Sequence, residues 1–206
     1  MEFNDKQIEI LQVAEKLFAE KGFDGTSVRE IAKLASINIA MISYYFGSKE
    51  KLLESIVLHR IGNMGLRLEN LLNEDISPIL KIERIIEYYI LQVNKNKHIH
   101  QIVNLEISNK KRDINFDSFK DLKKNNLKIV TSIVNEGQKQ GLFKPDVNVA
   151  LLSPLIIGSL VYFNMNKSLY GDLFGLKTEE DFDNYIKTEL LQHIQKTIKA
   201  LLVYEN

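Results

Sequence analysis

The chain has 206 residues and carries 27 basic and 27 acidic side chains, so its formal net charge is zero. It contains no cysteine, which excludes disulfide bonds, thiolate metal sites and a cysteine nucleophile. A hydrophobic content of 45% with only three prolines is typical of a globular protein with long helices. No signal sequence is recognisable, and no stretch approaches the roughly 20 apolar residues that cross a bilayer. We therefore expect a cytoplasmic protein without membrane segments.

The first 53 residues predict three short helices around a small core. Apolar residues at helical spacing mark the first helix, and Gly22 ends it. Thr26 or Ser27 can cap the second helix, and Glu30 follows Ser27 at the spacing of a capping box. Asn38 is a suitable N-cap for a third helix over residues 39–45. Two short helices joined by a tight turn are typical of the helix-turn-helix, which places its second helix in the major groove of DNA.

Two segments carry a resemblance to a known family: KGFDGTSVREIAKLAS at residues 21–36 and YYFGSKEKLL at residues 44–53. Residues 5–53 resemble the DNA-binding head of the TetR (tetracycline repressor) family of transcription regulators, and the rest is similar in layout alone. The resemblance implies an all-α protein of about nine helices. It places a helix-turn-helix domain at residues 1–47 and an effector-binding and dimerisation domain at residues 48–206. It also implies a homodimer, an operator of double-stranded DNA, a small-molecule effector and no cofactor.

The resemblance also assigns roles to single positions of the head. The expected DNA-binding residues are Thr26, Ser27 and Arg29 before and within the second helix, Asn38, Ala40, Met41, Ser43, Tyr44 and Tyr45 on the recognition helix, and Lys49 after it. Hydroxyl groups, an ammonium group and a helix N-terminus bind phosphate and fix the register without distinguishing sequences. Base contacts are expected from Ala40 and Met41 to thymine methyl groups and from Ser43 to base edges.

Three features depart from the family pattern. Residues 1–51 hold seven Lys or Arg against eight Asp or Glu, so we expect DNA binding through a few cations with a shallow salt dependence. Ser36 stands in the turn where the family commonly has glycine, and a left-handed serine costs on the order of 1 kcal/mol. Gly47 replaces a residue that is often basic or polar, which makes Lys49 and Lys51 more important.

The remaining sequence predicts further helices, because apolar residues recur three and four apart and no strict alternation persists. We expect helices over about 48–73, 78–94, 97–109, 116–141, 147–169 and 178–203, with loops at about 109–115 and 170–177. The first of these is the expected lever between head and body. The last two are candidates for dimerisation through Leu151, Leu155, Ile156, Leu160, Val161, Tyr185, Leu190, Ile194, Ile198 and Leu201. The alternative is that both helices are internal.

The effector pocket has the weakest signal. The candidates are seven residues of the middle helices: Tyr89, Val93, Ile102, Glu106, Phe119, Phe163 and Asn164. An ordinary core role is favoured for each, and Glu106 and Asn164 are of most interest because a polar group in apolar surroundings needs a partner. His98 and His100 lie two apart on a predicted helix and face different sides, so we predict no metal site. The basic segment 94–128 is interpreted as a solvated face.

These features predict a ligand-responsive repressor that is released from a palindromic operator when an effector changes the spacing of the two heads. An enzyme is disfavoured because the four histidines are dispersed along the chain and no catalytic motif occurs. The acid-rich first helix leaves a second class open, a helical protein-interaction adaptor that does not bind DNA.

Overall fold

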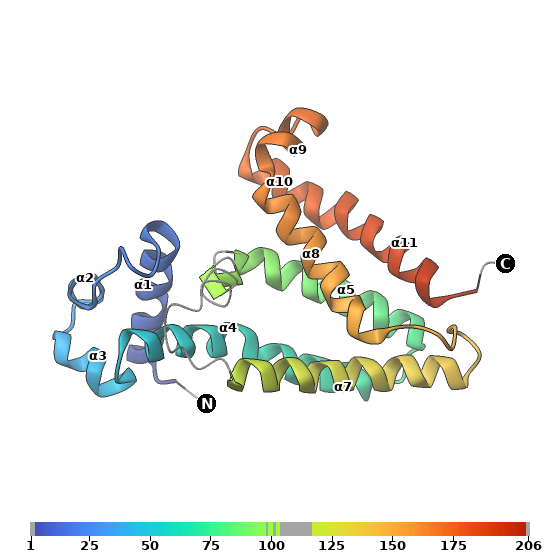
Figure 1. Ribbon diagram of the computed structural model, residues 1–206, viewed down its shortest axis with the longest axis horizontal. Helices are drawn as coiled ribbons and strands as arrows, with labels where there is room; N and C mark the ends of the chain where they lie inside the picture. Colours follow the sequence, from blue (N-terminus) through green and yellow to red (C-terminus); the bar gives the residue numbers. More distant parts are fainter. Residues whose placement is uncertain (1–2, 98, 101, 104–116, 205–206) are drawn as a thin grey trace. The chain divides into compact units, whose positions relative to one another are not determined.

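The computed structural model describes residues 3–97, 99–100, 102–103 and 117–204. The described part consists of helices and connecting turns without a β-strand, which confirms the all-α prediction (Figure 1). Contacts divide the chain into two compact units, residues 1–64 with 98–123 and residues 65–97 with 124–206.

The first unit contains the three predicted helices of the head, α1 (Asp5–Lys21), α2 (Val28–Leu34) and α3 (Ile39–Phe46). The predicted caps Ser27 and Asn38 are confirmed, since their side chains accept hydrogen bonds from the backbone N–H groups of Glu30 and Ala40. The full capping box at Ser27 is wrong, because the Glu30 carboxylate pairs with Lys21. A capping box forms instead at Asn4, the cap of α1.

The turn between α2 and α3 is a Schellman motif with a serine at its left-handed position. The N–H of Ser36 donates to the carbonyl of Lys33 at 3.2 Å, and the N–H of Ile37 donates to the carbonyl of Ala32 at 3.0 Å. Ser36 has a φ of 52°, the only positive φ outside glycine in the described residues. The left-handed conformation considered from the sequence is therefore present, and Ser36 carries its steric cost.

Helix α4 (Lys49–Leu72) closes the core of the first unit. Its residues Leu52, Leu53, Ile56 and Val57 are buried in the same cluster as the apolar residues of α1, α2 and α3. The expected boundary at residue 47 thus falls inside one core, because the apolar face of α4 covers the three-helix head.

The second unit is built around α5 (Pro78–Lys95), which packs against α8 (Leu152–Met165) and α11 (Leu191–Leu202). Helix α7 (Asp117–Lys139), α9 (Lys167–Phe174) and α10 (Glu179–Tyr185) complete the helices, with a 3-10 turn at Val149–Leu151 and a π-helical turn at Ile186–Leu190. Lys81 is buried in this unit, where its ammonium donates to the Leu72 carbonyl at 2.9 Å and to Glu136 at 3.2 Å. A buried charge requires such partners.

The segment after α8 differs from the expectation. The helix predicted over 147–169 breaks at Asn166, whose side chain donates to the carbonyl of Tyr162 at 2.8 Å, a local bond that competes with helix continuation. Residues 170–174, predicted as loop, belong to α9, which ends at Gly175 with a φ of 70°. The helix expected over 97–109 lies largely outside the described residues.

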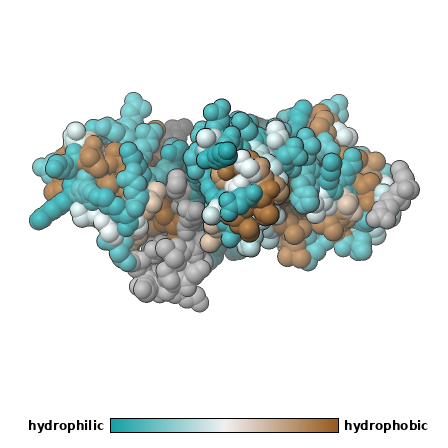
Figure 2. All heavy atoms as spheres, turned by 90° about the horizontal axis from the view of Figure 1, so that it is seen from above, coloured by the Kyte–Doolittle hydropathy of each residue, from teal (hydrophilic) through white to brown (hydrophobic). Residues whose placement is uncertain are grey.

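Large apolar side chains reach the surface in several places, and Figure 2 shows hydrophobic residues among hydrophilic ones on the visible face. Within the described residues, no single helix combines the length and hydropathy of a membrane span. Only the pair Val149–Met165 and Lys167–Phe174, bent by 83°, passes that test of length and composition together.

Candidate nucleic-acid interface

Helix α3 has one buried side and one exposed side. Ile42 and Phe46 lie in the core of the first unit, and this fixes the rotation of the helix. Ala40, Ser43 and Tyr44 are exposed as a result. Met41 and Tyr45 are partly exposed. A short helix with a locked apolar side and a solvent-facing row of small, hydroxyl and aromatic groups has the form of a recognition helix.

Among the described residues, Tyr44 is the most exposed of the large apolar side chains, with 80% of its surface accessible. Its ring packs edge-on against Tyr45, with centroids 5.2 Å apart and planes at 64°. Tyr45 in turn packs against the core, and its ring centroid lies 6.3 Å from that of Phe46. This row of rings supports the Tyr44 ring from one side while the side chain as a whole stays exposed, as a phosphate contact requires.

The start of α3 presents backbone N–H groups and the exposed Asn38 side chain. The Asn38 carboxamide oxygen accepts from the N–H of Ala40 at 2.9 Å, so it is occupied in setting the first turn. Ser27 likewise caps α2 by accepting from Glu30 at 3.1 Å, while Arg29 is exposed beside it. The caps therefore fix where each helix begins, which sets the position of the positive end of its dipole.

Thr26 does not face solvent. Its side chain is buried, and the single hydrogen of its hydroxyl is shared between the carbonyls of Gly22, at 2.8 Å, and Leu17, at 3.1 Å. The expectation that the Thr26 side chain contacts DNA is therefore wrong. Its hydroxyl instead closes the loop between α1 and α2, a role that the sequence does not distinguish from capping.

Lys49 is also engaged inside the first unit. Its ammonium group donates to the carbonyls of Phe23 at 2.8 Å and Thr26 at 2.9 Å. The same nitrogen lies 4.2 Å from the centroid of the Phe23 ring, a cation–π distance. Two of the three N–H donors of this lysine are therefore occupied by protein.

The exposed cations of the head are few. Arg29, Lys33 and Lys51 are exposed and form no ion pair with the described residues. Lys33 lies four residues after Arg29, so both are on one side of α2; the expected site omitted Lys33, although this spacing is visible in the sequence. The acids Glu9, Glu20 and Glu30 pair with lysines of α1, which offsets part of the negative charge of the head.

The candidate effector residues are divided between the two units. Tyr89 and Val93 of α5 and Phe163 and Asn164 of α8 belong to the second unit, and Tyr89, Val93 and Phe163 are buried there. Burial raises the pKa of the Tyr89 phenol, while hydrogen bonds with Ser153 and Asn126 act in the opposite direction. Ile102 and Phe119 are buried in the core of the first unit, and Glu106 lies outside the described residues.

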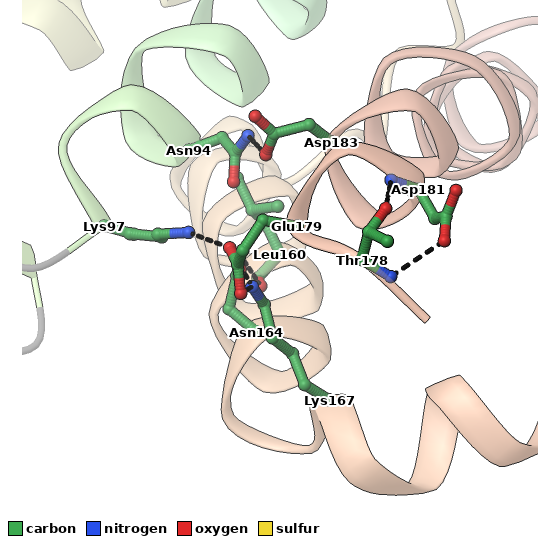
Figure 3. Close-up of polar contacts among 9 residues, drawn as sticks. All are labelled: Asn94, Lys97, Leu160, Asn164, Lys167, Thr178, Glu179, Asp181 and Asp183. Carbon is green, nitrogen blue, oxygen red and sulfur yellow. Dashed lines mark hydrogen bonds and ion pairs between the residues drawn. The ribbon is translucent and has the colours of Figure 1, made fainter. Parts of the chain in front are cut away.

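A polar cluster joins the end of α5 to α8, α9 and α10 (Figure 3). Glu179 accepts from Lys97 at 2.9 Å and from Lys167 at 2.6 Å, and these ammonium groups lower the pKa of its carboxyl to about 2. Asn94 donates to Asp183 at 3.0 Å, and Asn164 donates to the Leu160 carbonyl at 3.1 Å. The carboxamide oxygens of both asparagines are buried and have no hydrogen-bond partner among the described residues, so the cluster holds two unused acceptors there.

No group of three histidine, aspartate or glutamate side chains that could hold a metal ion occurs within the described ranges. The candidate binding surface of the first unit is formed by the exposed side of α3 and the exposed cations of α2. Together they define a helix-turn-helix DNA-binding protein with an attached helical body.

Comparison with known proteins identifies the family. Residues 10–56 match the family described as bacterial regulatory proteins, tetR family, and residues 78–198 match the tetracyclin repressor-like C-terminal domain. The chain therefore belongs to the TetR family of ligand-responsive, DNA-binding transcription regulators. Members of this family bind DNA operators, dimerise and bind small-molecule effectors.

Individual relatives agree with this assignment. The chain is 27% identical over 202 residues to the HTH-type transcriptional repressor NicS of Pseudomonas putida, covering 91% of each chain. Among solved structures, FadR from Bacillus subtilis in complex with stearoyl-CoA is similar, with a TM-score of 0.72 and 20% identity. The match covers 94% of this chain and 98% of the FadR chain. KstR2 of Mycobacterium tuberculosis is similar, with a TM-score of 0.68 and 19% identity. The match covers 99% of this chain and 98% of the KstR2 chain. At these identities the two structures show a common fold.

Proposed function

We propose that the protein is a homodimeric repressor that binds a near-palindromic operator through α3 and leaves it when a small-molecule effector binds the body. The observation that carries the DNA-binding part is the exposed row of Ala40, Ser43 and Tyr44 opposite the buried Ile42 and Phe46. Ser27, Arg29, Asn38, Met41 and Tyr45 complete the proposed contact surface. As a regulator of transcription, it would act in the cytoplasm and without catalytic activity.

For the dimer we propose the last helices, with α8 contributing the larger apolar part. Ile156 and Leu160 of α8 and Ile194 and Ile198 of α11 are buried within the subunit, so they are unsuitable as contacts between subunits. The exposed members of the expected set are Leu151, Leu155 and Leu201, and Tyr162 and Met165 extend the exposed apolar side of α8. Gly158 and Ser159 are also exposed on α8, and small residues allow two helices to approach closely.

The effector is proposed to act through α4. This helix runs without interruption from Lys49 in the first unit to Leu72 in the second, so a change around its second half reaches its first turn. An effector displaces the protein from DNA only by binding one conformation better than the other, with a typical coupling of about 1 to 3 kcal/mol. Its proposed contacts are Tyr89, Val93, Phe163 and Asn164 of the second unit, and the FadR complex supports a small molecule as ligand.

The DNA-binding proposal is tested by selection of bound duplexes from a random pool, followed by gel-shift titration. We expect enrichment of two inverted half-sites with centres about one helical turn, or 34 Å, apart. Met41→Ala and Ser43→Ala should select different bases within the half-site while keeping its spacing. If the wild-type protein enriches no sequence and binds no duplex, the adaptor alternative is favoured.

The dimer proposal is tested by sedimentation. We expect Leu155→Glu on α8 to convert a dimer to a monomer, because two carboxylates would face each other across a two-fold interface. Leu66→Glu changes another exposed leucine, on α4, and should leave the dimer intact. Native mass spectrometry of the purified protein would detect a retained effector by its mass.

A further inference from the structure

Lys49 lies where the helix-turn-helix ends and α4 begins. Its ammonium nitrogen is 2.8 Å from the carbonyl oxygen of Phe23 and 2.9 Å from that of Thr26. The same nitrogen lies 4.2 Å from the centroid of the Phe23 ring. Two charge-assisted hydrogen bonds and a ring face thus surround one side of the ammonium group.

The loop that offers these carbonyls is itself tightly constrained. The Thr26 hydroxyl shares its one hydrogen between the carbonyls of Leu17 and Gly22, and the ring of Phe23 stacks on Phe18 with centroids 5.2 Å apart. Gly25 has no room for a side chain, because an added Cβ would lie 2.3 Å from the carbonyl oxygen of Lys21. The loop that carries the two carbonyls is therefore held by contacts that do not involve Lys49.

The contact joins the two ends of the helix-turn-helix. Thr26 directly precedes Ser27, the N-cap of α2, while Lys49 follows Phe46, the last residue of α3, by three positions. The connection from residue 26 to residue 49 therefore encloses α2, the Ser36 turn and α3. A displacement of α4 that moved Lys49 would pull on the start of α2 as well as on the end of α3.

We propose that Lys49 is a positioning residue for DNA recognition, which clamps the start of α2 to the start of α4 and so fixes the orientation of α3. This role replaces the phosphate contact that the family resemblance assigns to Lys49. The inference rests on the proposed DNA-binding function, and it deepens that function by naming the device that holds the recognition helix.

The two roles differ in their dependence on salt. A lysine that neutralises a phosphate releases counterions, which contributes about 0.9 to the slope of log affinity against log salt, or about 1.8 for the two lysines of a dimer. A lysine that acts inside the protein lowers affinity when removed but leaves the slope unchanged. The variant Lys49→Arg distinguishes the two roles in a second way. It keeps the positive charge that a phosphate contact needs, but its guanidinium cannot reproduce the compact geometry of an ammonium group between two carbonyls.

The experiment measures affinity for the duplex selected by the wild-type protein at several salt concentrations, for Lys49→Met, Lys49→Arg and Lys51→Met. We expect both changes at Lys49 to weaken binding by about tenfold with a slope close to that of the wild type. Amide hydrogen exchange at the start of α2 should become faster in both. Lys51 lies two residues after Lys49, is exposed and forms no ion pair with the described residues, so Lys51→Met controls for loss of charge alone and should leave this exchange unchanged.

The opposite pattern would overturn the proposal: a slope reduced by about 1.8 in Lys49→Met, wild-type affinity in Lys49→Arg, and unchanged amide exchange in both. Wild-type affinity in Lys49→Met would also overturn it. If Lys49→Met fails to fold by circular dichroism, the affinity and exchange of Lys49→Arg decide between the two roles. A wild-type protein that selects no duplex contradicts the DNA-binding proposal instead, and amide exchange in the free protein still tests the clamp.

Discussion

Arg60 on α4 forms an ion pair with a single carboxylate oxygen of Glu15 on α1: its Nε donates a hydrogen bond to that oxygen at 2.8 Å, and its Nη2 lies 2.7 Å from it. The two side chains are only 27% and 16% exposed. Within the first unit, a polar contact therefore adds to the apolar packing between α1 and α4. The short distances and partial burial favour this ion pair. Removing one partner would leave the charge of the other partly buried without compensation.

We expect Glu15→Gln to lower the free energy of unfolding by about 1 to 3 kcal/mol, since the Arg60 guanidinium loses a charged acceptor. Arg60→Met should have a similar effect, and the double variant should be less destabilised than the sum of the two. The measurement is urea unfolding followed by circular dichroism. Glu20→Gln is the control, because Glu20 and Lys16 form an exposed pair at 4.0 Å and its removal should change stability by less than about 0.5 kcal/mol.

Ser36→Gly should stabilise the head by about 0.5 to 1 kcal/mol. Serine pays a steric cost at its φ of 52°, which glycine avoids, and the greater entropy of glycine in the unfolded chain offsets part of the gain. Ser36→Ala retains a Cβ and should bring no stabilisation, so it separates backbone strain from loss of the hydroxyl. A stability for Ser36→Gly equal to or below that of Ser36→Ala in the same urea titration would show that the turn is not strained.

The head was predictable because its signals are local. Ser27 and Asn38 each cap a helix that starts at the next residue, and the bonds that they accept come from two or three residues away. The strain at Ser36 follows from the place of one residue in a short turn. Local spacing determines both features, so a sequence displays them directly.

Thr26 and Lys49 were not predictable from the same signals. The carbonyls that capture Lys49 lie 26 and 23 positions earlier, and only the folded loop brings them to one point. In the body, an apolar stripe shows that a helix has a buried side but not which partner buries it. Thus Ile156 is internal while Leu155, its neighbour, is exposed. The break at Asn166 depends on a side-chain bond to the preceding turn, which competes with helical propensity and leaves no distinct pattern.

Tyr44→Phe should weaken operator binding about three- to tenfold, uniformly across sequences, because the phenol is proposed to hydrogen-bond phosphate and not a base. The ring remains, so its edge-on contact with Tyr45, with ring centroids 5.2 Å apart, should be unchanged. The thermal stability of the protein should therefore be unchanged as well. Gel-shift titration on the selected duplex and on single-base variants of it gives the test. Tyr204→Phe removes a hydroxyl from another exposed tyrosine and serves as control. Equal affinities for the wild type and Tyr44→Phe would remove this phenol from the interface.

The Glu179 cluster predicts a limited pH dependence of stability in the second unit. Lys167 and Lys97 lower the pKa of the Glu179 carboxyl from 4.5 to about 2, so the folded state favours the charged form. This contribution is present above pH 4.5 and is lost as the pH falls from about 4.5 to 2, where the carboxyl becomes protonated in both states.

Glu179→Gln should therefore be less stable than the wild type at pH 6, and the two should converge towards pH 2. Glu179 is 70% exposed, so solvent screens the pair and the difference should be a few tenths of a kcal/mol, smaller still in 1 M salt. Urea midpoints measured between pH 2 and pH 6 provide the comparison. Glu180→Gln changes an exposed neighbour that forms no ion pair within the described part of the chain, and it should follow the wild-type curve. A Glu179→Gln curve parallel to that of the wild type over the whole range would show that the two lysines do not stabilise the carboxylate.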